Sequence, residues 1–386
     1  MWQGGLRAFL WINRRELMKF LIAINIAAFT FTVLLVQERA TPAVGQLGKE
    51  VLLSETENAY NPIPSPDGRM IAYVRTGRWE KGSGGLGQSN LRSEVKLMDS
   101  EGRILTDKPL AETFLAGWTS DGKSLICYRN REYFLVSLSG EKTKAVSYMS
   151  DNIVDRGAYL DSIDAMIFVQ HFYQPARGVL RTVDQVIARN DTSHLGKMLV
   201  PSPDRRYIAA IDVTRWAEDQ LWVYDTQDKS WANLGKATIH PDIINPNNDW
   251  DWMQSTYNPW FADSSHLAFI SGSSIVVSTP DGRSRQTIIQ PSGTIGLATP
   301  SPDGKLIAYV TFDAKLNEEQ PQWTFWGNTR IWVVPAISGA KAHPLTNKAT
   351  ETTYCLRWLN NKEIVFDRLL HESFTNNARL WKVWVE

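Results

Sequence analysis

Two nearly identical eleven-residue segments lie far apart in this sequence: PSPDGRMIAYV begins at Pro64, and PSPDGKLIAYV begins at Pro300. The same pattern returns with substitutions in five further copies, which begin at Trp118, Tyr159, Pro201, Trp260 and Trp358. From one start position to the next, the copies are 54, 41, 42, 59, 40 and 58 residues apart. Repeats of this length are typical of β-propellers and other repeat architectures.

Each copy combines a tight turn with a short apolar strand. In Ser-Pro-Asp-Gly, Pro presets φ, Asp hydrogen-bonds back to the backbone and Gly adopts the left-handed conformation. The apolar run that follows, such as Ile71–Val74 or Ile307–Val310, predicts a buried strand. A further strand that ends in a second turn lies downstream, as in Val95–Gly102. Each unit therefore offers about four strands, the content of one propeller blade.

The sequence thus predicts an all-β fold, a β-propeller over residues 49–386. It has seven blades, or six if the degenerate copy at Tyr159 is only an insertion. The last copy supplies three strands, whereas Lys49–Glu55 reads as a strand that precedes the first copy. We therefore expect Val51–Ser54 to form the outer strand of the last blade, which closes the ring and removes exposed edges.

The motif SPDG(R/K)xIAYV, followed by an apolar strand and a second turn, resembles the WD40-like repeat of TolB-type β-propellers. A similar repeat occurs in the propeller domains of prolyl-oligopeptidase-like peptidases. The resemblance covers about residues 49–386 and implies the fold. It does not define the function, because such families include periplasmic adaptor proteins, peptidase propellers and some lyases. The sequence lacks the Gly-x-Ser-x-Gly elbow that a serine hydrolase domain would need.

The N-terminal region contains an uncharged run, Phe20–Val36, that follows several basic residues. At about 1.5 Å per residue it spans about 26 Å, close to the ~30 Å hydrocarbon core of a bilayer. It predicts one transmembrane helix with a cytoplasmic N-terminus. A cleaved signal segment is the alternative, since small residues occur at Ala43–Gln46. The predicted segments are a basic cytoplasmic start (1–19), the anchor (20–36), a linker (37–48) and the propeller (49–386).

The residue content excludes several kinds of chemistry. Lys plus Arg and Asp plus Glu both number 41, and no basic stripe indicates nucleic-acid binding. The two cysteines, Cys127 and Cys355, form neither a disulfide framework nor a CxxC site and are expected to be buried in strands. His171 and His371 follow the second strand of their units and could help to bind a metal near a central channel, or could be ordinary loop residues. We predict no catalytic residue, no metal site and no cofactor.

The tryptophans give the best indication of a binding surface. Six of the sixteen lie in loops that the repeat does not require: Trp79, Trp216, Trp250, Trp252, Trp323 and Trp326. These loops join second and third strands or lead into the next blade, so alternating strand directions predict that they share one face. Trp beside Asp and Asn suits protein hot spots or stacking on sugars, although these rings could also simply pack their own loops.

We therefore expect a non-catalytic scaffold for protein–protein interactions, with an envelope protein as its partner. The propeller would lie on the periplasmic or extracellular side of a bacterial cytoplasmic membrane, and the bacterial assignment rests on the TolB-type resemblance. The alternatives are a saccharide-binding module, or a propeller enzyme of the metal-assisted polysaccharide lyase type with its site at the mouth of the channel.

Overall fold

The computed structural model describes residues 47–54, 58–76, 93–129, 132–147, 153–160, 165–171, 178–181, 186–190, 198–211, 220–237, 258–316, 324–353, 355–368 and 378–385. Of some strands only the backbone is described. Within these ranges, no helix has the length and apolar character needed to cross a membrane. The predicted anchor at 20–36 lies outside the described residues.

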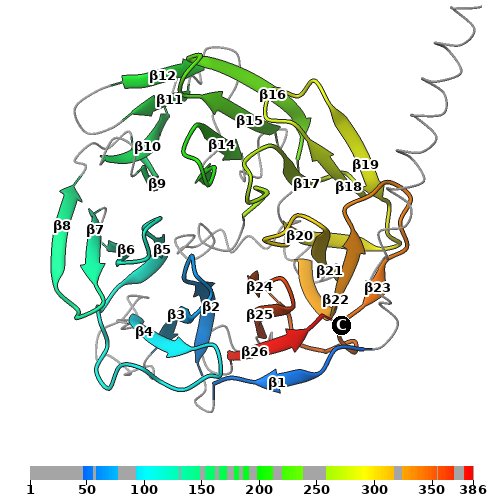
Figure 1. Cartoon of the computed structure of the whole chain (residues 1–386), viewed down its shortest axis with the longest axis horizontal. Coiled ribbons are helices and arrows are strands. Elements are labelled where there is room, and N and C mark those ends of the chain that lie inside the picture. Colours follow the sequence, from blue (N-terminus) through cyan, green and yellow to red (C-terminus); the bar gives the residue numbers. More distant parts are fainter. Residues whose placement is uncertain are drawn as a thin grey trace, which may run out of the picture. The chain divides into compact units, whose positions relative to one another are not determined.

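The described residues form an all-β β-propeller, in which seven antiparallel sheets surround a common centre (Figure 1). The first sheet contains β2 (Ala59–Pro64), β3 (Met70–Thr76) and β4 (Ser93–Asp99), and the second contains β5 (Phe114–Trp118), β6 (Ser124–Arg129), β7 (Glu132–Ser137) and β8 (Lys142–Ser147). The third contains β9 (Ile153–Leu160), β10 (Ala165–His171), β11 (Gly178–Arg181) and β12 (Val186–Asn190). The fourth contains β13 (Met198–Pro201), β14 (Tyr207–Ile211), β15 (Gln220–Asp225) and β16 (Ser230–Lys236). The other three contain β17 (Leu267–Ser271), β18 (Ser274–Ser278) and β19 (Arg285–Ile289); β20 (Thr294–Pro300), β21 (Leu306–Leu316), β22 (Thr324–Pro335) and β23 (His343–Pro344); and β24 (Leu356–Asn360), β25 (Glu363–Arg368), β26 (Arg379–Trp384) and β1 (Glu50–Leu52). Strands β2, β5, β20 and β24 lie towards the centre of the ring.

The sheet of β24, β25, β26 and β1, here called the closing sheet, joins two distant parts of the chain. Strand β1 pairs antiparallel with β26, and Val51 lies opposite Lys382. The pairing continues past β1, because Leu53 N donates to Leu380 O (2.8 Å) and Leu380 N donates to Ser54 Oγ (2.9 Å). This confirms the prediction that Val51–Ser54 supplies the outer strand of the last repeat unit.

The repeated turn is held by its own side chains. Ser65 Oγ donates to Asp67 Oδ1 (2.6 Å) and accepts from Met70 N (3.0 Å), while Arg69 N donates to Asp67 Oδ1 (3.1 Å). Gly68 has a φ of 69°, and a Cβ there would lie 2.3 Å from the carbonyl oxygen of Leu359 in the closing sheet. Glycine is therefore favoured by the backbone conformation and required by the close approach. The same hydrogen-bond pattern returns in the turns Thr119–Ser124, Ser202–Tyr207, Thr279–Ser284 and Ser301–Leu306.

Three tryptophans at the start of repeat copies connect neighbouring sheets. Each donates its indole N–H to the carbonyl oxygen just before the proline of the preceding copy: Trp118 to Ile63 (2.9 Å), Trp260 to Val200 (2.8 Å) and Trp358 to Thr299 (3.0 Å). Apolar clusters fill the contacts between sheets, as between the β2–β4 and β5–β8 sheets, where Ile63, Leu97, Leu115 and Leu125 are buried together. Both cysteines are buried, as predicted, and neither forms a disulfide; Cys127 lies in β6 and Cys355 directly precedes β24.

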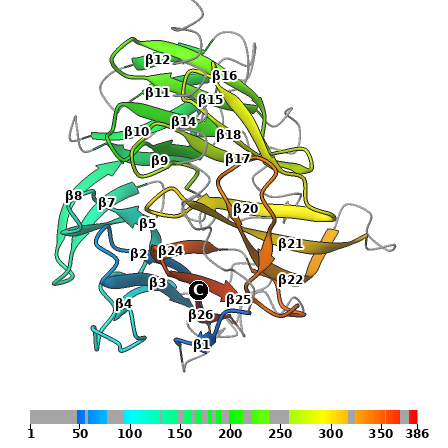
Figure 2. The same cartoon turned by 45° about the vertical axis from the view of Figure 1, so that its right-hand side comes forward.

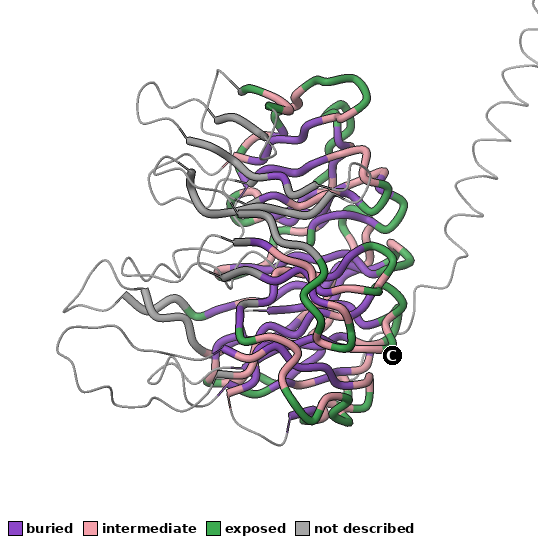
Figure 3. The backbone as a smooth tube through the Cα atoms, turned by 90° about the vertical axis from the view of Figure 1, so that its left-hand side faces the viewer, coloured by how far each residue is buried: buried purple, intermediate pink, exposed green. Residues whose placement is uncertain are grey.

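The two ends of the sheets differ. The repeated turns, which join first to second or third to fourth strands, lie at one end, here called the turn side. The second-to-third connections leave at the opposite end, the loop side, because successive strands are antiparallel. Figure 3 shows the exposed turns gathered mostly along one side of the ring.

Candidate functional site

The predicted binding face falls almost entirely outside the described residues. Trp79, Trp216, Trp250, Trp252 and Trp323 lie outside them, and Trp326 belongs to β22, where only its backbone is described. The same holds for the two histidines considered as metal ligands: His371 is not described, and His171 ends β10 with only its backbone described. The grouping of these side chains stays a prediction.

The strands that border three of these segments are described, and they end on the loop side. The last pairs are Thr76 with Ser93 in the β3–β4 ladder, Ile211 with Leu221 in the β14–β15 ladder, and Leu316 with Thr324 in the β21–β22 ladder. Each ladder joins the second and third strands of a repeat unit. The chain therefore leaves all three sheets at the same end, as the repeat alignment predicts.

Among the described strands, those of the β21–β22 hairpin are the longest. Its strands have 11 and 12 residues, and the ladder runs from Leu306 opposite Pro335 to Leu316 opposite Thr324. Figure 2 shows both strands reaching past the neighbouring sheets. The register shifts between Thr311 and Asp313. The hairpin thus changes its pairing where it leaves the body of the sheet.

Polar side chains brace this hairpin at the shift. Asp313 Oδ2 accepts a hydrogen bond from Asn328 Nδ2 (3.1 Å) and forms an ion pair with Lys348. Thr329 bridges to Ala349 and donates its hydroxyl to the carbonyl oxygen of Glu351 (2.7 Å). We call Asp313, Asn328 and Lys348 the hairpin base. The segment after β23 therefore holds the hairpin to the sheet.

Aromatic and cationic side chains lie on β21 and β22 between the hairpin base and the turn side. The rings of Tyr309 and Trp332 stack with centroids 6.4 Å apart and planes at 10°. The Arg330 guanidinium lies 5.6 Å from the centre of the Trp332 ring, and Trp332 Nε1 donates to Thr311 Oγ1 (2.9 Å). Trp332 and Arg330 are only partly buried. A partly exposed stack of aromatic and guanidinium groups is chemistry that suits protein recognition.

Trp332 lies in β22, the third strand of its repeat unit, and packs against an apolar cluster. Sequence reasoning missed Arg330 and the hairpin base. The signal that could have found them is the length of the strands on both sides of residues 317–323, which have 11 and 12 residues.

On the turn side, the carboxylates of the repeated turns accept hydrogen bonds within those turns. Hydrogen bonds from Ser65 and from the Arg69 backbone lower the pKa of Asp67, and the matching bonds from Thr279 and Arg283 lower the pKa of Asp281. These groups are stabilised as anions within their own turns. They are therefore poor candidates for proton transfer near neutral pH.

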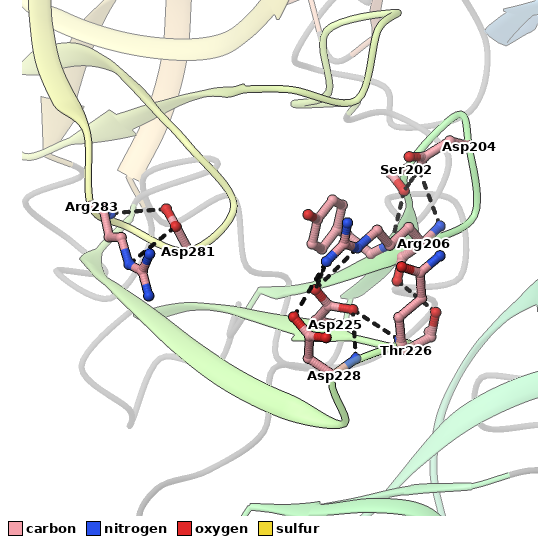
Figure 4. Close-up of polar contacts among 10 residues, drawn as sticks. Ser202, Asp204, Arg206, Asp225, Thr226, Asp228, Asp281 and Arg283 are labelled. Carbon is pink, nitrogen blue, oxygen red and sulfur yellow. Dashed lines mark hydrogen bonds and ion pairs between the residues drawn. The ribbon is translucent and has the colours of Figure 1, made fainter.

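A denser group of charges on the turn side is also internally paired. Arg206 donates to Asp225 Oδ2 through Nε (3.1 Å) and Nη2 (2.7 Å) and lies 3.3 Å from Asp228 Oδ2. Figure 4 shows Arg206 reaching both carboxylates, while Asp281 and Arg283 form a separate pair. Burial tends to raise the pKa of Asp225, but the bonds from Arg206 and the backbone lower it overall. The described residues contain no group of three His, Cys, Asp or Glu side chains that could hold a metal ion.

The ring of antiparallel sheets defines the chain as a β-propeller. It is similar in structure to the oligogalacturonate lyase from Vibrio parahaemolyticus, with a TM-score of 0.58 and 12% identity, covering 88% of this chain and 94% of that one. Weaker similarities link it to a TolB protein from Agrobacterium tumefaciens (TM-score 0.38, 13% identity, 75% and 94% covered) and to the tricorn protease (TM-score 0.37, 13% identity, 80% and 28% covered). No protein-family model and no curated protein sequence matches the chain. At such low identity the lyase similarity supports the fold alone.

Proposed function

We propose that this protein is a non-catalytic interaction scaffold that binds a protein of the bacterial cell envelope through the loop side of its propeller. The observation that carries the proposal is the contrast between the two sides. On the turn side, the carboxylates of the repeated turns are held by hydrogen bonds within those turns. On the loop side, a braced hairpin extends beyond the sheet, and the partly buried Arg330 and Trp332 follow the hairpin base within β22.

Rigid support is what such a surface requires. A partner gains more affinity from side chains that are already held in place, because less conformational entropy is lost on binding. The hydrogen bonds and the ion pair of the hairpin base supply that support for the segment that carries Trp323 and Trp326. Aromatic residues of this kind dominate binding energy at protein interfaces. We therefore propose that the six loop tryptophans form the contact surface.

We also infer the placement of the propeller in the envelope. The run at 20–36 is long enough for a single membrane-spanning anchor, and the basic residues before it favour a cytoplasmic N-terminus. The propeller would then lie on the periplasmic or extracellular side. We further infer that each of the seven sheets is one blade, since the β9–β12 sheet contacts β13 through its own inner strand, β9.

The test is crosslinking of the full-length protein in its native membrane, followed by capture and identification of what is attached. The variant changes Trp250, Trp252, Trp323 and Trp326 to Ala. The matched control changes Leu105 and Ile337 to Ala, two exposed apolar residues (50% and 57%) outside the loop segments. A protein lost from the tryptophan variant and retained by the control supports the scaffold. A capture that is the same for wild type and both variants contradicts it.

An enzyme or saccharide-binding module with its site at the mouth of the channel is the second candidate. The similarity to a structure named as an oligogalacturonate lyase, over 88% of this chain, is compatible with this candidate. A metal-assisted polysaccharide lyase of this fold would draw on residues such as His171 and His371. Cleavage of an acidic polysaccharide that is lost in His171→Ala and His371→Ala would favour this candidate over the scaffold.

A further inference from the structure

The contact between the closing sheet and the β2–β4 sheet, here called the closure seam, contains an unusual set of buried polar groups at its inner end. Its apolar part includes Leu53, Ile71, Leu359 and Val365. Beside these, Asn61, Cys355 and Asp367 are nearly inaccessible, at 1%, 0% and 2% exposed. Buried polar groups are costly unless they are hydrogen-bonded.

Strand alternation places a fourth polar residue, Arg357, in this seam. Trp358 on the innermost strand β24 faces the preceding sheet, where its indole bonds to Thr299. Cys355 faces the other way and contacts the carbonyl oxygen of Pro62 in β2 (3.4 Å). Because side chains two residues apart share a face of a strand, Arg357 also faces β2. It lies on a strand near the centre of the ring (Figure 1).

The negative charge of the group is already stabilised. The Asp367 carboxylate accepts hydrogen bonds from the backbone N–H of Cys355 (2.8 Å) and from that of Asn61 (3.1 Å). One donor belongs to each side of the seam. Asp367 therefore joins the two innermost strands.

The positive charge of Arg357 is not compensated in the same way. Its side chain lies beside the Cys355 thiol, its buried Nε has no hydrogen-bond partner, and it forms no ion pair with any described residue. The two buried cations of the closing sheet, by contrast, each form an ion pair with a carboxylate. Arg368 pairs with Glu50 (2.7 Å), and Lys382 pairs with Glu363 (3.0 Å). Burial lowers the pKa of Arg357, and its closeness to Cys355 opposes this shift.

We propose that Arg357 forms the centre of a binding site for a small oxyanion at the inner end of the closure seam. A guanidinium presents its N–H donors in a planar fork that matches the oxygens of a carboxylate or a phosphate. Arg357 is only partly buried as a residue. An anion bound there offsets the isolated charge. It also stabilises the closed ring, because it binds the folded state and not the unfolded one.

The test measures thermal unfolding of the full-length protein in detergent by tryptophan fluorescence, at constant ionic strength set with chloride. Inorganic phosphate, sulfate and acetate are titrated separately. We expect a saturable rise in the unfolding temperature with at least one of them, and its identity separates tetrahedral from planar anions. Arg357→Met abolishes the rise. Arg283→Met keeps it, since that side chain is 89% exposed and pairs with Asp281.

Two further measurements keep the proposal open to refutation. Without oxyanions, Arg357→Met should be at least as stable as the wild type, because it removes an uncompensated charge. Should that variant not fold, equilibrium dialysis of labelled phosphate, competed by sulfate and acetate, still tests the wild type. The proposal fails if no oxyanion binds saturably, if Arg357→Met keeps the full rise, or if the rise only grows linearly with concentration, as a general salt effect would.

Discussion

Changing Trp118 to Phe removes an indole N–H that joins two neighbouring sheets. Its bond to the Ile63 carbonyl is 2.9 Å long, and Trp118 is 8% exposed. Trp222 provides a matched comparison, because it is 9% exposed and its Nε1 is buried without a hydrogen-bond partner among the described residues. Both substitutions remove the same ring atoms. The difference between them therefore isolates the hydrogen bond.

The expected size follows from this contrast. The smaller ring costs both variants a similar free energy of packing. Only Trp118→Phe leaves a buried carbonyl oxygen without its donor, which costs about 1–3 kcal/mol. Trp222→Phe instead removes a buried donor that has no acceptor. We expect the unfolding free energy of Trp118→Phe to lie about 1–3 kcal/mol below that of Trp222→Phe.

Urea unfolding followed by far-UV circular dichroism measures this difference, provided that both variants unfold with the wild-type m-value. Trp260→Phe and Trp358→Phe should behave like Trp118→Phe, since their indole bonds are 2.8 and 3.0 Å long. A difference below about 0.5 kcal/mol between the two classes would refute the reasoning, because it lies outside the cost expected for an unsatisfied buried carbonyl.

Three further predictions follow from other contacts. Gly272→Ala should lower the unfolding free energy by about 1–2 kcal/mol, because the new side chain is placed on a left-handed backbone. Gly68→Ala should lower it clearly more, because of the two new Cβ atoms only this one would meet a carbonyl oxygen. Urea unfolding of both variants measures the difference. The lowered pKa of Asp67 adds stability that is fully present above the ordinary pKa of the group, 3.8, and is lost as the pH falls through the folded-state value. Asp67→Asn should therefore reduce the loss of unfolding free energy between pH 7 and pH 3. Lys382→Met should lower the unfolding free energy by about 3–5 kcal/mol, because it leaves the mostly buried Glu363 carboxylate without its cation. Equal stability of this variant and the wild type would contradict that role for the ion pair.

Much of the fold could be predicted from the sequence, because the repeat encodes it locally. The turn at Ser65–Met70 forms the hydrogen bonds that its residue types favour, and the role of Val51–Ser54 followed from counting strands. The indole bonds were not predictable, since they join residues of neighbouring copies at distances that only the packed ring defines. Their tryptophans were identified, but not their acceptors.

The polar groups of the closure seam were missed for another reason. Asp367 ends the segment WLNNKEIVFD, the copy that begins at Trp358, and Arg357 precedes it. The role of Asp367 depends on its contact with Asn61 in β2, 306 residues earlier in the chain. The loop tryptophans could be predicted as a group but not placed, because the repeat fixes where their strands end and not what lies between those ends.

Ring closure by β1 has a consequence for how the propeller folds. Residues 50–52 pair with residues 381–383, so the last ladder joins segments that are more than 300 residues apart in the chain. Contacts of such long range are slow to form, since the entropy of closing the loop must be overcome before the contact stabilises anything. During synthesis, the segment that becomes β1 emerges long before its partner exists. We expect the final and slowest folding step to be the docking of β1 on β26.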